Sequence, residues 1–378
     1  MGDHKLDKND LYCPMIHNGL EINVRQNSDE IELRPCCVKT GSGFQTEIQN
    51  DMWNDDRFLP MIETNKNNQW HEDCSNCKNI EQAGHLSFRQ GMYSAWGKEE
   101  RLSGPRRIDF MFNVSCNLAC RTCGSNLSTY WQKHLKENNI SFPAPPVNKS
   151  GEEAIEILKK FDLSHLRSIT FCGGETLLGN EYWKICEYLS TLPHAKESLM
   201  ISFQTNGTQP IPEKRYELLE KFHLVKLHIS IDGTKERFEY LRWPAEWNQV
   251  TDNLFKIRES APGNVMFLLE ETISIFNLAY IGEVAEWKKK YFNTNREGDP
   301  VDHTHHTAFG NYHIAGCTQE YVDFARQSEH TNIIPSNWQE DPELIKKIIS
   351  EIKKFDSFRN QSFQKSLPEV AKFYKRYL

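Results

Sequence analysis

From Arg107 onward the sequence alternates strand-like and helix-like stretches, and this alternation limits the folds that the chain can adopt. Strand-like runs recur near 107–114, 167–172, 199–205, 225–231 and 264–274, each followed by a helix-like stretch such as GEEAIEILKKF. A further strand is expected around VDHTHHTAF. Strands that alternate with helices predict right-handed βαβ units and a parallel sheet.

The phase of the side chains along these strands predicts the shape of the sheet. In 225–231, the residues Val225, Leu227 and Ile229 share one face, whereas Lys226, His228 and Ser230 share the other. Two more of the runs, 107–114 and 199–205, alternate in the same way. Since a parallel sheet covered by helices on both sides is apolar on both faces, we expect a curved, barrel-like sheet with a polar lumen. Its functional residues should lie at the carboxyl ends of the strands.

The chain has 11 cysteines, and their meaning depends on the compartment. The polar start MGDHKLDKND predicts no signal peptide, and no apolar run approaches the roughly 20 residues of a membrane helix, so we expect a cytoplasmic protein. In a reducing compartment, cysteines bind metals, catalyse or pack rather than form disulfides. The net charge of −7 disfavours a nucleic-acid partner, which needs clustered Lys and Arg.

Three cysteines follow the first strand in the sequence NVSCNLACRTCG, as Cys116-x3-Cys120-x2-Cys123. Three thiolates on one short loop can hold three irons of a 4Fe–4S cluster and leave the fourth iron open to another ligand. A structural zinc site uses four protein ligands, and no fourth Cys or His is near in sequence. Zinc binding and simple packing are the alternatives.

Residues 107–275 resemble the radical S-adenosylmethionine (SAM) family. The resemblance rests on the CxxxCxxC loop after the first strand, on Gly173-Gly174-Glu175 after the second, on QTNGT after the third and on SIDG after the fourth. It implies a partial (β/α)6 TIM-like barrel of the α/β class, in which SAM chelates the open iron through its amino and carboxylate groups.

By the same resemblance, Gly173 and Gly174 let the backbone approach SAM, and Glu175 accepts a hydrogen bond from its ammonium group. Ser230 is expected to hydrogen-bond the ribose and Arg242 to pair with the SAM carboxylate. Two lumen-phased residues, Gln204 and Asn206, are expected to touch SAM or the substrate. The sequence departs from the commonest family pattern at Thr122, where an aromatic residue is usual, and at Thr176, where Pro often stands.

A second group of cysteines precedes the barrel: Cys13, Cys36, Cys37, Cys74 and Cys77. It resembles the auxiliary-cluster modules called twitch or SPASM, although those modules normally follow the barrel. Four thiolates complete a second 4Fe–4S site, so that one of Cys36 and Cys37 is surplus. Structural zinc is the alternative, because four cysteines that end in CxxC also describe a zinc ribbon. We therefore expect a small irregular cluster-binding domain at 1–100, the barrel at 101–320 and a helical extension at 321–378.

Catalytic residues are not evident from the sequence, and the candidates are Cys172, Glu270 and His305. Cys172 precedes the two glycines, and Glu270 has the inner phase of the fifth strand. His303 and His305 share a face if 301–309 is a strand, and would then line the substrate pocket. Together with His306 these histidines resemble a metal motif, but no carboxylate or cysteine completes it convincingly.

The resemblance implies an enzyme in which a flavodoxin- or ferredoxin-type reductant supplies one electron and SAM yields a 5′-deoxyadenosyl radical that removes hydrogen from a substrate. A peptide or protein side chain is the leading substrate class, and a carbohydrate, nucleoside or modified base is the runner-up. A non-catalytic iron–sulfur electron carrier and a zinc-stabilised binding module are rival classes. The sequence does not identify the substrate or the bond that is broken.

Overall fold

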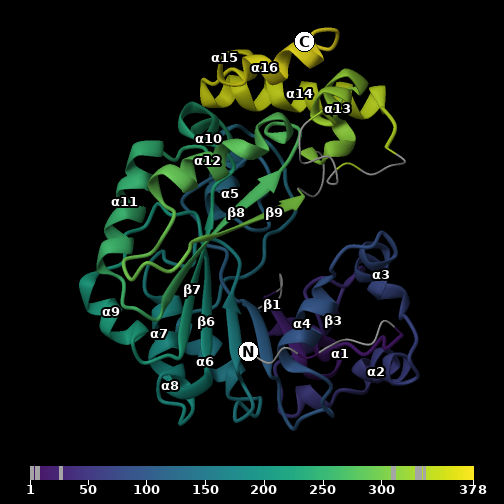
Figure 1. Cartoon of the computed structure of the whole chain (residues 1–378), viewed down its shortest axis with the longest axis vertical. Helices are drawn as coiled ribbons and strands as arrows, with labels where there is room; N and C mark the ends of the chain where they lie inside the picture. The colour runs from purple at the N-terminus through teal and green to yellow at the C-terminus, as the bar shows by residue number, and fades with distance from the viewer. Residues whose placement is uncertain (1–3, 5–8, 25–28, 308–311, 328–333, 335–337) are drawn as a thin grey trace. The chain divides into compact units, whose positions relative to one another are not determined.

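The computed structural model describes residues 4, 9–24, 29–307, 312–327, 334 and 338–378. The chain divides into two compact units, each assembled from separate stretches. The first unit comprises Met1–Val114, Ala144–Phe203 and Glu220–Val225, and the second comprises Ser115–Pro143, Gln204–Leu219 and Lys226–Leu378. Each unit is described by itself below, with the labels of Figure 1.

The first unit contains a six-stranded arrangement that is parallel from β1 onward. In spatial order its strands are β3 (Phe44–Glu47), β2 (Glu30–Arg34), β1 (Gly19–Val24), β4 (Arg107–Met111), β5 (Ser168–Phe171) and β6 (Met200–Thr205), of which Gln204 and Thr205 are counted with the second unit. The β3–β2 and β2–β1 pairs are antiparallel, and the β1–β4, β4–β5 and β5–β6 pairs are parallel. Leu20, Ile108, Ile169 and Ile201 lie opposite one another across four strands and form one buried apolar row.

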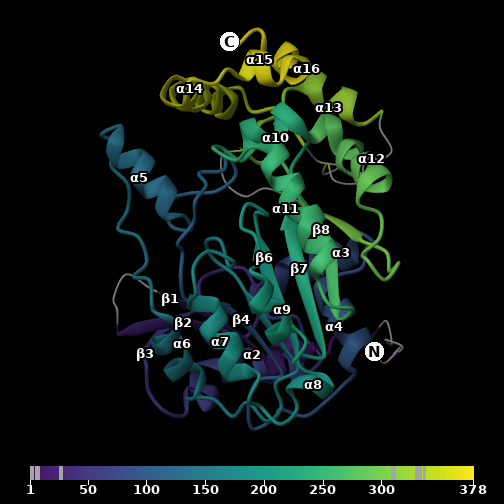
Figure 2. The same cartoon turned by 90° about the vertical axis from the view of Figure 1, so that its left-hand side faces the viewer.

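The helices of the first unit are mostly short. They are α1 (Pro14–Asn18), α2 (Leu59–Lys66), α3 (Ser75–Gln82), α4 (Phe88–Trp96), α6 (Gly151–Leu158), α7 (Glu181–Leu189) and α8 (Ala195–Ser198), with 3-10 turns at Met52–Asn54, Asp56–Phe58 and Glu72–Cys74. Two helices, α6 and α7, pack against each other, as Figure 2 shows. Two serines begin helices by capping boxes, Ser87 at α4 and Ser150 at α6, because each hydroxyl accepts from a backbone amide of the first turn.

The second unit contains β7 (Leu224–Ser230), whose first two residues are counted with the first unit, then β8 (Val265–Ile273) and β9 (Asp302–Thr307), which pair in parallel. Its helices are α5 (Thr129–Glu137), α9 (Glu213–Leu219), α10 (Lys235–Leu241), α11 (Trp247–Ser260), α12 (Ile281–Tyr291), α13 (Gln319–Ala325), α14 (Pro342–Arg359), α15 (Phe363–Ser366) and α16 (Pro368–Ala371). Among its described residues, 3-10 turns lie at Leu278–Tyr280, Ile314–Gly316 and Lys372–Tyr374. The C-terminal helices α13 to α16 lie close together (Figure 1). They contribute to one apolar cluster that also includes Tyr240 and Phe276.

The structure confirms the expected strands and the α/β class with a mostly parallel sheet. The expected sixth strand is β9, although residues 308 and 309 of that run lie outside the described residues. The predicted phases also hold, since Ile108 and Phe110 are fully buried and every second residue of β7 is half-buried. In β4, the polar face is itself buried at Asp109, whose carboxylate pairs with Arg107.

The N-terminal strands join the same sheet as the expected barrel strands. The division at residue 100 stays a prediction, and β1 pairs with β4 across it. Among the described residues, no helix is both long and apolar enough to cross a membrane.

A buried arginine fixes the loop that contains Cys116, Cys120 and Cys123 in the second unit. Arg121, which is fully buried, makes an ion pair with Asp356 of α14 and donates to the side-chain oxygen of Gln361 at 2.9 Å. Its guanidinium also lies 4.1 Å from the ring centre of Tyr240. The C-terminal helix therefore holds the cysteine loop in place, although the two are more than 200 residues apart in sequence.

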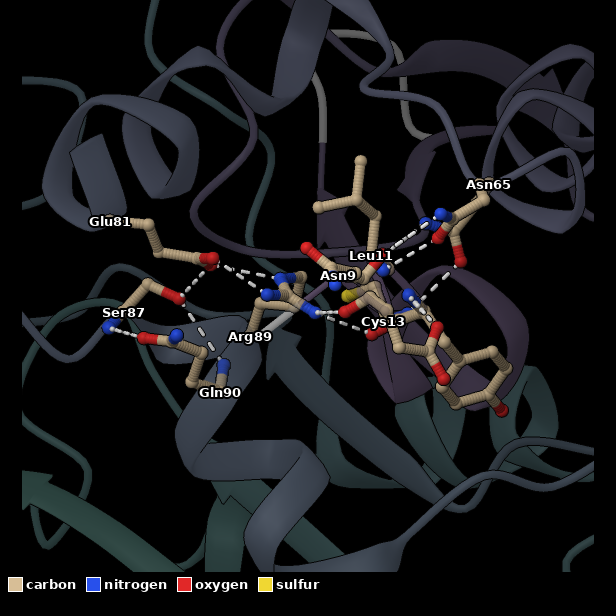
Figure 3. A network of polar contacts seen from close by, with 11 residues as sticks. Asn9, Leu11, Cys13, Asn65, Glu81, Ser87, Arg89 and Gln90 are labelled. Carbon is tan, nitrogen blue, oxygen red and sulfur yellow. Dashed lines mark hydrogen bonds and ion pairs between the residues drawn. The ribbon is translucent and has the colours of Figure 1, made fainter. Parts of the chain in front are cut away.

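A second buried arginine connects two of the segments that contain the N-terminal cysteines, as the network around Cys13 in Figure 3 shows. The guanidinium of Arg89 in α4 makes a two-point ion pair with Glu81 of α3, at 2.9 and 2.6 Å. It also donates to the backbone oxygens of Asp10 and Tyr12, at 3.0 and 2.9 Å. One side chain thus ties the CxxC helix to the extended segment that leads into Cys13.

We expect Arg121→Met to lower the free energy of unfolding by about 3–5 kcal/mol, because it leaves the Asp356 carboxylate, whose side chain is only 13% exposed, without its cation. Urea unfolding followed by circular dichroism measures the change. The matched control is Arg296→Met, whose partner Glu297 is exposed, and it should change stability by about 0.5 kcal/mol or less. Superimposable urea curves for Arg121→Met and the wild-type chain would contradict this role.

We expect Arg89→Met to loosen the segment before Cys13. Hydrogen-exchange mass spectrometry should show amides of residues 9–18 exchanging roughly tenfold faster or more, since each 1.4 kcal/mol lost from the closed state gives about a factor of ten. Lys98→Met is the control, because Lys98 contacts Asp10 of the same segment from an exposed position. Equal exchange in both variants would refute the anchoring role of Arg89.

Candidate functional site

The second unit presents three cysteines on one loop without regular secondary structure: Cys116, Cys120 and Cys123. Two backbone hydrogen bonds hold the loop against the last residue of α10 and the segment that follows it. The amide of Ala119 donates to the carbonyl oxygen of Trp243 at 2.8 Å, and the amide of Arg121 donates to that of Leu241 at 2.7 Å. The three thiols are therefore fixed beside the end of α10, where Arg242 lies.

A buried cation lies near these thiols. Burial raises the pKa of Cys120, and the guanidinium of Arg242 acts in the opposite direction on Cys120 and Cys123. Arg242 is 7% exposed and pairs with the buried Asp232 at 2.9 Å, while its Nε has no hydrogen-bond partner among the described residues. A buried guanidinium with an unused donor suits an additional anionic group, such as thiolates on a metal cluster or a carboxylate. The residues present therefore fit both a thiolate-bound cluster and the carboxylate of SAM.

The other predicted SAM residues of the second unit lie at or just after strand ends. Asn206 lies beside the cysteine loop, with its Nδ2 3.9 Å from Cys116 Sγ and 3.0 Å from Asn117 Oδ1. Ser230 ends β7 half-buried, and Gln204 is exposed near the end of β6. The structure thus brings Asn206 and Arg242 to the cysteine loop and leaves the predicted roles of Ser230 and Gln204 as predictions.

The Gly173-Gly174-Glu175 turn follows β5 in the first unit. Gly173 has φ +119°, and a Cβ there would lie 2.4 Å from the carbonyl oxygen of Asn113, so only glycine fits. The carboxylate of Glu175 is buried and accepts a hydrogen bond from the amide of Leu177 at 3.0 Å. The turn is rigidly built, and the contact of Glu175 with the SAM ammonium stays a prediction.

Four of the five N-terminal cysteines line one cavity of the first unit: Cys13, Cys36, Cys74 and Cys77. Arg89, which holds the segment before Cys13 in place, also lines this cavity, so it lies beside the four thiols. Cys37 is not among the lining residues, although its thiol is close enough to Arg107 to affect the pKa of that guanidinium.

All four of these thiols have raised pKa values. Burial raises the pKa of Cys13 to about 12 and that of Cys74 to about 11, and it also raises that of Cys77. For Cys36, a hydrogen bond with Cys37 is the first cause, and burial is the second. Backbone amides that face the sulfurs offset part of this effect, such as those of Ile16 and Arg89. These thiols would lose their protons to solvent on binding a metal ion, and the amide hydrogen bonds would then stabilise the resulting thiolates.

The three catalytic candidates do not share one environment. Cys172 lies in the first unit near Asp109, Cys37 and Arg107, and burial raises its pKa well above the usual value. Glu270 lies on the half-buried face of β8, where His228 Nδ1 is 2.7 Å from its Oε1. Burial alone would raise the pKa of Glu270, but hydrogen bonds from His228 and His306 outweigh it and lower this pKa to about 2.

His305 lies on the opposite face of the strand pair from Glu270. In the β8–β9 register, His303 pairs with Leu269 and His305 with Glu271, so both histidines share the apolar face of β8. They do share a face, as expected, but it is not the face of Glu270. The expectation that no carboxylate completes a metal motif with these histidines was wrong, because Glu271 lies beside them. Spacing along the sequence cannot reveal Glu271 as a partner of these histidines, because only the pairing of β8 with β9 brings it beside them.

Sequence reasoning also missed Asp232, Arg89 and Arg121. Asp232 is the third residue of the SIDG stretch and Arg121 lies inside the cysteine loop, so both stand within motifs that the sequence analysis had identified. Arg89 lies in an ordinary amphipathic helix and gave none.

Solved structures of low similarity cover this chain to different extents. anSMEcpe with bound AdoMet is 20% identical with a TM-score of 0.40 over 58% of this chain and 55% of that chain. Streptococcus suis SuiB bound to S-adenosylmethionine is 12% identical with a TM-score of 0.40 over 90% and 69%. SuiB bound to the precursor peptide SuiA is 13% identical with a TM-score of 0.38 over 92% and 75%. The chain spans just over half the length of anSMEcpe.

Sequence comparison points to one family. None of the curated proteins matches this chain. The family model of the Radical SAM superfamily matches residues 111–276, a stretch that includes the cysteine loop, the glycine turn and Arg242. Over residues 111–276, which are less than half of its length, this chain is therefore similar to the Radical SAM superfamily.

Proposed function

We propose that the chain is a radical SAM enzyme with its reaction centre at Cys116, Cys120 and Cys123. The observation that carries the proposal is that Arg242, with an unused buried donor, interacts electrostatically with Cys120 and Cys123, on the same fixed loop as Cys116. Three thiols leave one iron of a 4Fe–4S cluster open, which a closed electron-transfer site does not. The match of residues 111–276 to the Radical SAM superfamily supports the same function.

The residues around the loop have separate tasks in this proposal. Arg242 binds the SAM carboxylate, Glu175 binds its ammonium, and Asn206 orients the ligands next to Cys116. When bound, the cluster and SAM supply the 5′-deoxyadenosyl radical that removes hydrogen from the substrate. A flavodoxin- or ferredoxin-type protein supplies the electron. The chain itself binds, orients and excludes water, for which a partial (β/α)6 barrel is suited.

The polar inner face of β7 and β8 is the proposed substrate side. His228 and Glu270 meet there, and the low pKa of Glu270 keeps its carboxylate charged at neutral pH. A charged carboxylate that is half-buried can hold a cationic or hydrogen-bonding group of a substrate. A peptide or protein side chain is our leading substrate class, and a carbohydrate, nucleoside or modified base is the alternative. The proposed location is the cytoplasm.

We also propose that Cys13, Cys36, Cys74 and Cys77 bind a second 4Fe–4S cluster, and that Cys37 is the surplus cysteine. These four thiols line one cavity, and Cys37 does not. Four thiolates saturate such a cluster and leave no open iron, so this site serves electron transfer rather than SAM binding. The twitch-like arrangement expected from the sequence supports this reading, and a structural zinc ion is the alternative.

Anaerobic reconstitution tests the reaction centre. After loading with iron and sulfide, the chain with dithionite and SAM should form 5′-deoxyadenosine, detected by chromatography and mass spectrometry. Cys120→Ala should form about a hundredfold less or none, because the cluster loses one of only three protein ligands.

The matched control is Cys317→Ala, which removes a buried thiol of the C-terminal apolar cluster and should leave 5′-deoxyadenosine formation intact. If the wild-type protein loads iron fully but forms no 5′-deoxyadenosine, it is an electron carrier, and the proposal that it is an enzyme is wrong. Wild-type protein that takes up only zinc overturns both iron sites.

Iron analysis of two neighbouring variants tests the second cluster. We expect about eight irons in the wild-type chain, about four in Cys36→Ser and about eight in Cys37→Ser. The reverse order for the two variants would assign the ligand to Cys37. Four irons and one zinc in the wild-type chain, with the zinc lost in Cys36→Ser, would favour the zinc alternative.

A further inference from the structure

Glu271 is a carboxylate in an unexpected place. Strand β8 alternates buried and half-buried residues, and Glu271 has the phase of the buried Leu269 and Ile273. Its side chain is fully buried, whereas the neighbouring Glu270 points to the opposite, polar face. An ionised carboxylate in such surroundings is strongly unfavourable unless it is paired or coordinates a metal.

Strand pairing brings two imidazoles to this carboxylate. Because His305 lies directly opposite Glu271 and His303 is two residues earlier on β9, all three side chains share one face. The Nε2 atoms of His303 and His305 lie 3.5 and 3.3 Å from Glu271 Oε2. One ligand atom from each residue lies within 4.8 Å of the others.

The two carboxylate oxygens of Glu271 have different surroundings. Oε1 is 3.4 Å from the amide nitrogen of Asn277, a fully buried residue whose side chain also donates to the backbone oxygens of Asp232 and Thr272. Oε2 and the Nε2 of His303 are both buried and have no hydrogen-bond partner among the described residues. Asn277 thus orients the carboxylate by one oxygen and leaves the other facing the imidazoles, as outer-sphere partners do at metal sites.

The spacing suits a metal better than a proton. Charge-assisted hydrogen bonds between an imidazole and a carboxylate are about 2.7–2.9 Å long, which is shorter than both separations here. Two ligand atoms about 2.0–2.1 Å from a tetrahedral ion lie about 3.4 Å apart, and the observed 3.5 and 3.3 Å agree with this value. Imidazole nitrogens with one carboxylate favour transition metals over Mg²⁺ or Ca²⁺.

We propose that Glu271, His303 and His305 bind one divalent transition-metal ion, with Zn²⁺ as the best-suited ion. Three protein ligands leave one position for water or another small ligand, and His305, at 27% side-chain exposure, gives access from solvent. The ion joins β9, the last strand in the order, to β8. This site uses no cysteine and is separate in its ligands from both proposed clusters.

Zinc binding by the full, cluster-loaded chain tests the proposal. After chelator treatment, the chain is dialysed against buffered Zn²⁺ and its zinc content is measured by mass spectrometry, with iron measured in the same sample. We expect Glu271→Gln to hold one zinc per chain less than the wild-type chain. The matched control is Glu270→Gln, the adjacent position on the opposite face, which should keep the wild-type zinc content.

A second variant keeps the test conclusive if Glu271→Gln does not fold. His305→Gln lies on the partly exposed strand β9 and should also lose one zinc, with an unchanged circular dichroism spectrum and iron content. The midpoint of thermal unfolding should rise with added Zn²⁺ in the wild-type chain and in Glu270→Gln but not in His305→Gln. Equal zinc content in the wild-type chain, Glu271→Gln and His305→Gln, or equal loss in Glu270→Gln, would overturn the proposal.

Discussion

The ion pair between Arg121 and Asp356 fixes the part of the chain on which the proposed chemistry depends. The three-cysteine loop has no helix or strand hydrogen bonds of its own, so its shape must come from contacts made elsewhere. Arg121 stands between two of the cysteines and is fully buried against α14 and Tyr240. Because a buried charge without its partner is strongly unfavourable, the loop and the C-terminal helix are ordered together. The C-terminal helices are thus part of the cysteine loop's support.

The N-terminal cysteines have the same kind of support. Arg89 combines a two-point ion pair to Glu81 with donation to the two backbone oxygens just before Cys13. Arginine suits both positions, because its planar guanidinium offers five donors in fixed directions and stays charged when buried. A lysine has a single ammonium and cannot span a carboxylate and two carbonyl groups in one plane. Irregular, thiol-bearing segments therefore depend on buried guanidinium groups in both units.

Periodicity predicted what depends on local pattern, and it missed what depends on pairing between distant segments. The strands, and the burial of Ile108 and Phe110, follow from alternation, because a strand must place every second side chain on its covered face. The distinction between Cys36 and Cys37 does not follow from alternation, because adjacent residues in a turn have no regular pattern of facing. Only the folded structure shows that Cys36 lines the cavity and Cys37 does not. The same holds for Glu271, whose partners come from β9, 32 and 34 residues later in the printed numbering.

Adjacent glutamates on β8 show how one strand can serve two separate chemistries. Successive side chains of a strand point to opposite faces. Glu270 therefore contacts His228 on the polar face, whereas Glu271 lies beside His303 and His305 on the other face. A shift of β9 by one residue would exchange these environments, so the register must be strongly fixed. An ion held by Glu271 and the two histidines would fix it, because a shifted β9 would present Thr304 and His306 instead. In the observed register the Nε2 of His306 lies 3.6 Å from Glu270 Oε1. A metal ion that fixes this register on one face would therefore also keep His306 beside Glu270 on the other face.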